Sequence, residues 1–344
     1  MSMRLDRWNL YALMLKCRLF EEAVARLWDE GLISGEMHLG TGEEAIIAGV
    51  VPQLRAEDAL ALDHRGTAAM LLRGVDPVLL LREMLGRPDG LCGGRGGHMH
   101  LFSKEHLAAS SGLVGAEGPA AAGFALAARY LRPGAVAVAF FGDGAMNQGM
   151  LLESLNLAAV WQLPVLFVCK DDGWAITTPS RTVTAGEMGE RVRGLGVPYV
   201  PVDGLDVAAV WRAAEAALVR AREGGGPTFI HARCVHLEGH FLGFPLLRML
   251  RHPLKEMVPI TGPLVRALLR RGGAPFGERV AGVRQVIAVL LAAWRDPRQS
   301  KANDPLHRAR VPLSAADPDR LQALESRIAR EVAESVAAAV EEGD

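Results

Sequence analysis

Short apolar runs alternate with longer amphipathic stretches along most of this 344-residue chain. Residues 135–141 and 164–169 are two such runs and predict buried strands, while residues 147–161 between them are apolar at helical spacing and predict one helix. Residues 199–202 and 227–234 predict further strands on either side of a helix over 207–222. This strand-helix-strand alternation predicts an α/β fold built on a parallel sheet.

Amphipathic periodicity also predicts helices at both ends of the chain. Residues 5–30 and 119–130 predict helices, and a last helix begins at Asp317-Pro318. Its apolar stripe consists of Leu321, Leu324, Ile328, Val332 and Val336. Residues 31–42 and 91–111 predict connections, and the second of these is interpreted as an ordered loop rich in glycine and histidine.

The chain divides by composition into three parts. Residues 1–245 hold the alternating strands and helices, and residues 304–344 are a C-terminal helical segment. Between them, residues 246–303 are rich in arginine and predict two helices, over 263–271 and 278–294. We interpret this basic insertion as a solvated face over packed helices. A docking surface for an acidic partner and a lid over the active-site entrance are the alternatives.

Two predicted strands end in acidic turns. Gly142-Asp143-Gly144 follows the first run, and Asp171-Asp172-Gly173-Trp174 follows the second. Ligands of open parallel sheets bind beyond the carboxyl ends of the strands, so Asp143 and Asp172 are expected side by side in one crevice. Carboxylates beside a helix N-terminus suit Mg²⁺ bound to a diphosphate. The alternative for the Gly-Asp-Gly tripeptide alone is an ordinary strand-terminating turn.

Overall composition favours an intracellular enzyme subunit. Half of the residues are hydrophobic, enough to bury a large core. The formal net charge of −1 argues against nucleic acid as a partner. The N-terminus lacks the pattern of an export signal, and no apolar run reaches about 18 residues, so we expect a cytoplasmic protein without a membrane span. The four cysteines are scattered and are expected to be reduced packing residues.

Several motifs resemble those of one enzyme family and occur in the same order along the chain. They are GEMHLGTGEEA (35–45), DHRG (63–66), GGRGGHMHL (93–101), GLVGAEGP (112–119), FGDGAMNQGMLLESLNLAAVWQLP (141–164), VDGLD (202–206) and EGH (238–240). The chain resembles the alpha subunits of thiamine-diphosphate-dependent 2-oxo acid dehydrogenases and the related acetoin dehydrogenases. The resemblance implies a three-layer parallel-sheet thiamine-diphosphate-binding fold over residues 1–245, with helices on both faces and a C-terminal helical extension.

The same resemblance implies thiamine diphosphate and Mg²⁺ as cofactors and assigns roles to single residues. The implied metal ligands are the side chains of Asp143 and Asp172 and the carbonyl of Trp174. The implied diphosphate contacts are the backbone of Gly144 and Ala145 and the side chains of His38, His64, Arg65 and His240. The backbone of Gly112 and Val114 would hold the aminopyrimidine ring, and His240 would lie near the reacting carbon as the catalytic residue.

The chain departs from the family pattern at two places. Relatives usually carry Glu-Asn-Asn where this chain has Lys170-Asp171-Asp172, so an acid replaces the metal-ligating Asn. We hypothesise that two carboxylates hold the cation more tightly and the diphosphate less tightly. Phe244 stands where relatives commonly carry Asp. His98 and His100 could suggest a further metal site, but a structural role is favoured for both.

The resemblance further implies partners. The glutamate that activates the cofactor comes from a separate beta subunit in this family, which implies an α₂β₂ heterotetramer that passes an acyl group to a lipoyl-bearing acyltransferase. Pyruvate, branched-chain 2-oxo acids and acetoin all stay open as substrates. The alternative is a divergent, weakly active or non-catalytic subunit that serves assembly or regulation. A nicotinamide-binding Rossmann enzyme ranks far lower, because no G-x-G-x-x-G follows an early strand.

Overall fold

The computed structural model describes residues 5–176 and 178–243, scattered positions between 262 and 284, and residues 300–341. Its centre is a seven-stranded sheet in the order β2-β3-β1-β4-β5-β9-β8. The bounds of these strands are β1 Ala59–Leu62, β2 Phe102–Ser103, β3 Ala108–Ser110, β4 Ala137–Gly142, β5 Val165–Asp171, β8 Tyr199–Asp203 and β9 Thr228–Arg233. All neighbours pair in parallel except β2 and β3. The predicted parallel sheet is therefore present.

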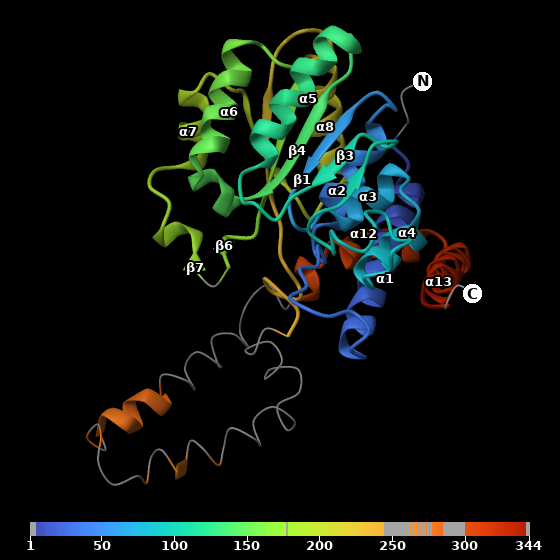
Figure 1. Cartoon of the computed structure of the whole chain (residues 1–344), viewed down its shortest axis with the longest axis vertical. Coiled ribbons are helices and arrows are strands. Elements are labelled where there is room, and N and C mark those ends of the chain that lie inside the picture. Colours follow the sequence, from blue (N-terminus) through green and yellow to red (C-terminus); the bar gives the residue numbers. More distant parts are fainter. Residues whose placement is uncertain are drawn as a thin grey trace.

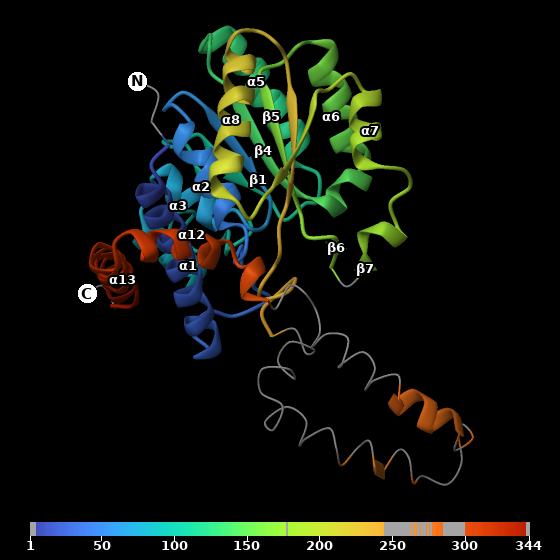
Figure 2. The ribbon, with the colours of Figure 1, turned by 180° about the vertical axis from the view of Figure 1, so that it is seen from behind.

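Helices cover both faces of the sheet (Figures 1 and 2). One face carries α5 (Glu117–Leu131), α6 (Gly149–Val160) and α7 (Met188–Gly194), and the other carries α2 (Glu44–Val50), α3 (Thr67–Arg73) and α8 (Val207–Arg222). Along β4, Val138 and Phe140 pack into the core of the α2/α8 side, whereas Ala139 and Phe141 pack into the core of the α5/α6 side. Burial on both faces explains why the strand is a continuous apolar run.

The two ends of the chain pack together outside the α2/α8 layer. The N-terminal helix α1 (Arg7–Asp29) lies against the last helix, α13 (Pro318–Val340), which also packs on α4 (Pro77–Met84). The Tyr11 hydroxyl on α1 donates to a Glu325 oxygen on α13 at 2.5 Å, and Leu321, Ile328 and Val332 of the predicted stripe are buried. The predicted C-terminal helical extension is therefore present, preceded by α12 (Pro305–Ala316).

Single turns and a small hairpin complete the described chain. The turns are η1 (Val51–Gln53), η2 (Asp143–Asn147), η3 (Ser180–Thr182) and η5 (Lys301–Asn303), and the hairpin pairs β6 (Trp174–Ala175) with β7 (Thr178–Pro179). In the described part of the chain, none of the helices is both long enough and apolar enough to cross a membrane.

Three sequence-based expectations need correction or fall outside the structure. Residues 91–111 were expected to form a loop but contain β2 and β3. These strands were not predicted because two or three residues are too short to show a period. The helix after Gly142-Asp143-Gly144 begins at Gly149, since the turn η2 comes first. Of the helices expected over 263–271 and 278–294, residues 277–284 are described as a helical run, and residues 265, 266 and 269 are described as single helical positions. Most of the other residues in these two ranges, and Phe244, lie outside the described residues.

Candidate functional site

Asp143 stands directly beyond the carboxyl end of β4. Strands β4 and β5 pair in parallel with Gly142 opposite Lys170, so the acidic residues that follow the two strands share one edge of the sheet. Asp143 is 3% exposed, and its Oδ2 atom is buried without a hydrogen-bond partner among the described residues. Burial, Asp171 and Asp172 raise the pKa of Asp143 to about 7 against a lowering contribution from Ser180. A buried carboxyl with an unused oxygen fits a cation ligand.

Lys170 is fully buried between two carboxylates. Its Nζ atom lies 2.6 Å from an oxygen of Glu43 and 3.0 Å from an oxygen of Asp63. Burial alone would lower the pKa of Lys170, but Asp63 and Glu43 raise it above its usual value. Burial raises the pKa of Glu43, and Lys170 together with His236 outweighs burial and brings it to about 2. The lysine is therefore charged and neutralises acids from two other segments.

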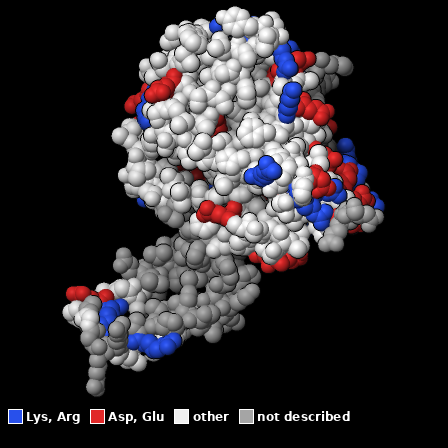
Figure 3. All heavy atoms as spheres, viewed as in Figure 1, with Lys and Arg blue, Asp and Glu red and all other residues white. Residues whose placement is uncertain are grey.

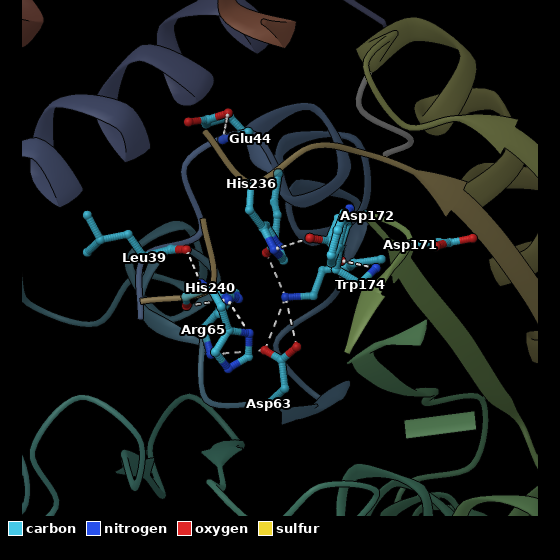
Figure 4. Close-up of polar contacts among 12 residues, drawn as sticks. Leu39, Glu44, Asp63, Arg65, Asp171, Asp172, Trp174, His236 and His240 are labelled. Atoms are coloured by element: carbon cyan, nitrogen blue, oxygen red, sulfur yellow. Dashed lines mark hydrogen bonds and ion pairs between the residues drawn. The ribbon is translucent and has the colours of Figure 1, made fainter. Parts of the chain in front are cut away.

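The next two residues point in opposite directions from the end of β5 (Figure 4). Asp171 contacts His231 Nε2 at 2.5 Å, and its other oxygen accepts the Gly173 N–H at 2.8 Å. Tyr199 completes this group, because its hydroxyl lies 2.5 Å from His231 Nδ1. Asp171 is thus tied to the β8/β9 side of the sheet.

Asp172 points to the other side and pairs with His236. His236 Nδ1 lies 2.9 Å from Asp172 Oδ2, while His236 Nε2 lies 2.7 Å from Glu43 Oε1. Asp172 Oδ1 also accepts the Trp174 N–H at 3.2 Å. Burial opposes ionisation of Asp172, but His236 lowers its pKa to about 2. Burial and Arg65 work against a charge on His236, yet Asp172 and Glu43 raise its pKa above the usual value.

Three of the predicted histidines meet beside Arg65. Ring centroids lie 4.7 Å apart for His38 and His64, 4.9 Å for His38 and His240, and 5.6 Å for His64 and His240. His98 accepts a hydrogen bond from the His38 backbone N–H through Nε2 at 3.2 Å. This contact is in line with the structural role that was favoured for His98. Burial followed by Arg65 lowers the pKa of His38 to about 3 and that of His240 to about 4. These rings are therefore neutral at neutral pH.

Arg65 gives this histidine cluster its electrostatic character. The guanidinium is 2% exposed, donates to the carbonyl oxygens of Leu39 and His240, and lies 3.4 Å from His240 Nδ1. One nitrogen from each of His38, His64 and His240 lies within 4.8 Å of the others, close enough to consider a metal ion. A buried guanidinium beside neutral imidazoles instead favours an anion such as a phosphate group.

The predicted backbone contacts lie on two loops. On the η2 turn, Ala145 is buried, and a Cβ atom at Gly144 would lie 3.3 Å from Ala175 Cβ. On the other loop, Gly112 borders Met99 and His100, while the Val114 side chain is 49% exposed. The roles predicted for these residues and for the Trp174 carbonyl remain predictions.

Sequence reasoning overlooked the buried charges that surround the predicted ligands. Glu43, Asp63 and His236 received no role, and Lys170 and Asp171 were noted only as departures from the family pattern. Glu43 and Asp63 lie inside motifs that carry the resemblance, and His236 lies four residues before His240. Their place in or near these motifs was the available signal that they belong to the site. Their pairing could not be predicted, because the partners lie up to 193 residues apart in sequence.

Comparison with known proteins identifies the family. Residues 11–243 match the dehydrogenase E1 component family. The chain is 43% identical over 237 residues to the alpha subunit of acetoin:2,6-dichlorophenolindophenol oxidoreductase from Cupriavidus necator, covering 68% of this chain and 71% of the relative. It is 37% identical over 277 residues to the pyruvate dehydrogenase E1 component subunit alpha of Zymomonas mobilis, covering 79% and 78%.

A solved structure agrees at the level of fold. Transketolase from Campylobacter jejuni superposes with a TM-score of 0.50 at 17% identity, covering 67% of this chain and 38% of that one. Two thirds of the present chain thus shares a fold with part of a larger enzyme, and the sequence matches above extend over the same share or more. The chain belongs to the dehydrogenase E1 component family.

Proposed function

We propose that this chain is the alpha subunit of a thiamine-diphosphate-dependent dehydrogenase that decarboxylates a 2-oxo acid or cleaves acetoin. The acyl group passes to a lipoyl-bearing acyltransferase, and the active assembly is an α₂β₂ heterotetramer. The observation that carries the proposal is Asp143, a buried acid with an unused oxygen at the carboxyl end of β4. Family membership supports the same cofactor, and the relatives named above are alpha subunits.

The residues present fit a metal-bound diphosphate. Asp143, Asp172 and the Trp174 carbonyl would hold Mg²⁺ through oxygen atoms, the ligands that this ion prefers. The amides of Gly144 and Ala145 would meet the diphosphate, and Arg65 supplies a buried, fixed cation for it. The side chains of His38, His64 and His240 would line the same anion site.

Bound thiamine diphosphate supplies a ring that accepts the electrons released when the 2-oxo acid loses carbon dioxide. The chain's own contribution is to bind, orient and exclude water. His240 would lie nearest the reacting carbon, held in place by its carbonyl contact with Arg65 at 2.6 Å. Gly112 and Val114 would support the aminopyrimidine ring through their backbone. Without a beta subunit, the chain would be catalytically silent.

The outer helices offer a surface for a partner subunit. Figure 3 shows few charged side chains over α5 and α6. Tyr130, Leu131, Val160 and Trp161 are all exposed large hydrophobic residues on these two helices or directly after them. Arg129 donates to the carbonyl of Trp161 at 2.7 Å, which brings the two helix ends together. Exposed apolar groups on a face with few charges support assembly with another chain.

The alternative of a non-catalytic assembly or regulatory subunit is not favoured. It was motivated by Asp172, Phe244 and the basic insertion over residues 246–303. Lys170, Asp171 and Asp172 each have a partner in the structure, so they do not leave bare charges at the cofactor site. Phe244 and most of the basic insertion lie outside the described residues.

The test is reconstitution with a beta subunit. The co-purified pair is assayed for carbon dioxide release and dye reduction with pyruvate, branched-chain 2-oxo acids and acetoin, in the presence of thiamine diphosphate and Mg²⁺. We expect turnover of at least one substrate, none from the alpha chain alone, and none from a pair carrying Asp143→Ala. A pair that binds the cofactor but turns over none of these substrates would favour the assembly role instead.

A further inference from the structure

Glu83 on α4 is a fully buried acid that accepts hydrogen bonds from the backbone of the next loop. Its Oε2 atom accepts the Cys92 N–H at 2.6 Å and the Gly94 N–H at 2.9 Å. Its Oε1 atom accepts the Gly96 N–H at 2.6 Å. Ionised carboxylates accept hydrogen bonds and donate none, so this side chain can satisfy all three donors at once. The loop over residues 92–96 is therefore folded around one carboxylate.

Glycines allow the loop to approach Glu83 this closely. A Cβ atom at Gly90 would lie 2.6 Å from the Glu83 backbone nitrogen, and one at Gly96 would lie 3.3 Å from Glu83 Oε1. Gly94 has φ +71°, a conformation that larger residues rarely adopt. The glycines and the carboxylate together specify one conformation of the loop.

Helix α4 gives Glu83 a rigid base. Leu80 on the same helix is fully buried in the core, and α4 packs against the C-terminal helix α13 (Figure 1). Just after α4, Arg87 donates to the Val340 carbonyl oxygen at the end of α13 at 2.7 Å. The carboxylate is thus held in place by the core and by α13, and its contacts fix the loop relative to both.

The Gly96 peptide extends this order to the residues that follow it. Its N–H is donated to Glu83, and its carbonyl oxygen accepts the His100 N–H at 3.1 Å. The Met99 carbonyl oxygen accepts the Ser110 hydroxyl at 2.9 Å, which ties the same turn to β3. The chain between Gly96 and His100 is therefore fixed at both of its ends.

Two side chains of this turn lie against proposed cofactor contacts. His98 is 5% exposed and accepts the His38 N–H through Nε2 at 3.2 Å, and the two rings stack with centroids 5.3 Å apart. The His100 ring borders Gly112, where a Cβ atom would lie 3.3 Å from Nε2. The loop that Glu83 organises therefore supports one residue proposed for the diphosphate and one proposed for the aminopyrimidine ring.

We propose that Glu83 is a positioning residue that folds the loop over residues 92–96 into the shape that the cofactor site needs. Through this loop it places two rings against the proposed cofactor contacts His38 and Gly112. The inference rests on the proposed binding of thiamine diphosphate, because it assigns the loop to that site. Glu83 acts through the loop and takes no part in the chemistry.

The experiment uses the reconstituted α/β complex with Glu83→Gln. Glutamine has a similar shape but only one oxygen, so in either orientation of its amide at least one loop N–H faces an NH₂ group instead of an acceptor. Hydrogen exchange over residues 94–101, measured by mass spectrometry without cofactor, should become faster on the order of tenfold or more. Half-saturating thiamine diphosphate at excess Mg²⁺, measured by fluorescence quenching, should also rise on the order of tenfold.

Asp58→Asn is the matched control. Asp58 is also fully buried and accepts two backbone N–H groups, from Arg55 at 2.7 Å and from Val136 at 2.8 Å, but it precedes β1 at the amino edge of the sheet. We expect this variant to lower the melting temperature of the complex while half-saturation and the exchange of residues 94–101 stay as in the parent. If Glu83→Gln also lowered only the melting temperature, its role would be merely structural and the proposal would be overturned.

A second variant tests the path through His98. His98→Ala removes the acceptor of the His38 N–H, so it should raise half-saturating thiamine diphosphate as well. Because Glu83→Gln and His98→Ala disturb the same path, the effect of the double variant should fall well below the product of the two single effects. Effects that multiply fully would contradict the proposed path.

The parent complex provides a test that does not depend on the folding of any variant. Without cofactor, the amides of residues 92–96 should be protected from exchange, and exchange as fast as in an unstructured peptide would overturn the inference. If the parent complex binds no thiamine diphosphate, the proposed function fails even where the loop is protected as expected. If the parent binds it and Glu83→Gln behaves like the control, only this inference fails.

Discussion

Replacing Lys170 with methionine removes the cation that balances two buried acids. Its Nζ lies 2.6 Å from Glu43 and 3.0 Å from Asp63, and the side chain is 1% exposed. Methionine fills a similar volume, so the change acts mainly through charge. Removing one partner from a buried ion pair costs about 3–5 kcal/mol, because the remaining charge is left without compensation. We therefore expect the melting temperature of Lys170→Met to fall on the order of 10 °C.

The pH dependence of this loss follows from Glu43. Its pKa is lowered from 4.5 to about 2 in the folded chain, so its stabilising contribution is present above pH 4.5 and disappears as the pH falls towards 2. The difference between parent and Lys170→Met should accordingly be largest near neutral pH and should shrink in acid. Thermal unfolding followed by circular dichroism from pH 3 to pH 8 measures both effects.

A compensating variant separates charge from packing. Lys170→Met combined with Glu43→Gln removes one of the two stranded acids and should regain part of the lost stability. The reasoning would be refuted if Lys170→Met melted within about 2 °C of the parent at pH 7, or if the double variant were no more stable than the single one. The glutamate that relatives usually carry at this position should be worse than methionine, because it adds a third acid to Glu43 and Asp63.

Three further predictions concern separate parts of the site. Glu117 is 3% exposed, and burial raises its pKa from 4.5 to about 8, so the folded chain loses stability as the pH rises between these two values. Glu117→Gln should therefore raise the melting temperature at pH 8 and leave it unchanged at pH 4. Gly42 has φ +104°, and a Cβ there would lie 1.8 Å from the Val235 oxygen, so Gly42→Ala should yield little folded protein in a solubility and circular-dichroism assay. Arg65→Lys loses the forked donor to the Leu39 and His240 carbonyls, and cofactor titration of the complex should show affinity weakened roughly tenfold or more.

Local sequence signals were sufficient for most of the main-domain fold. The run over 135–141 became β4, the helix predicted over 207–222 is α8 with the same bounds, and the stripe beginning at Leu321 lies on α13. These elements are long or strongly periodic, so their own residues specify them. The short strands β2 and β3 were missed because two or three residues cannot display a period, and β3 pairs with β1, more than 40 residues away in sequence.

The candidate site was predictable only where one residue's chemistry was decisive. Asp143 could be named from its place between turn glycines at a strand end, whereas Arg65 was named only through the family resemblance. The partner of Asp172 could not, because His236 lies on a separate segment after β9 and nothing in its neighbours marks it as an ion-pair partner. Charge pairing across a parallel sheet joins segments that the sequence keeps far apart.

Departures from a family pattern therefore have to be judged as a set. Read one at a time, a lysine and two acids in place of Glu-Asn-Asn suggest a damaged metal site. In the structure, Lys170 pairs with two acids from other segments, Asp171 contacts His231, and Asp172 contacts His236. The local field that a cation and a diphosphate would meet is then set by Asp143 and Arg65, which both lie within motifs shared with the family. Lys170, Asp171 and Asp172 each contact another charged or titratable side chain of this chain, so their presence is compatible with the roles proposed for Asp143 and Arg65.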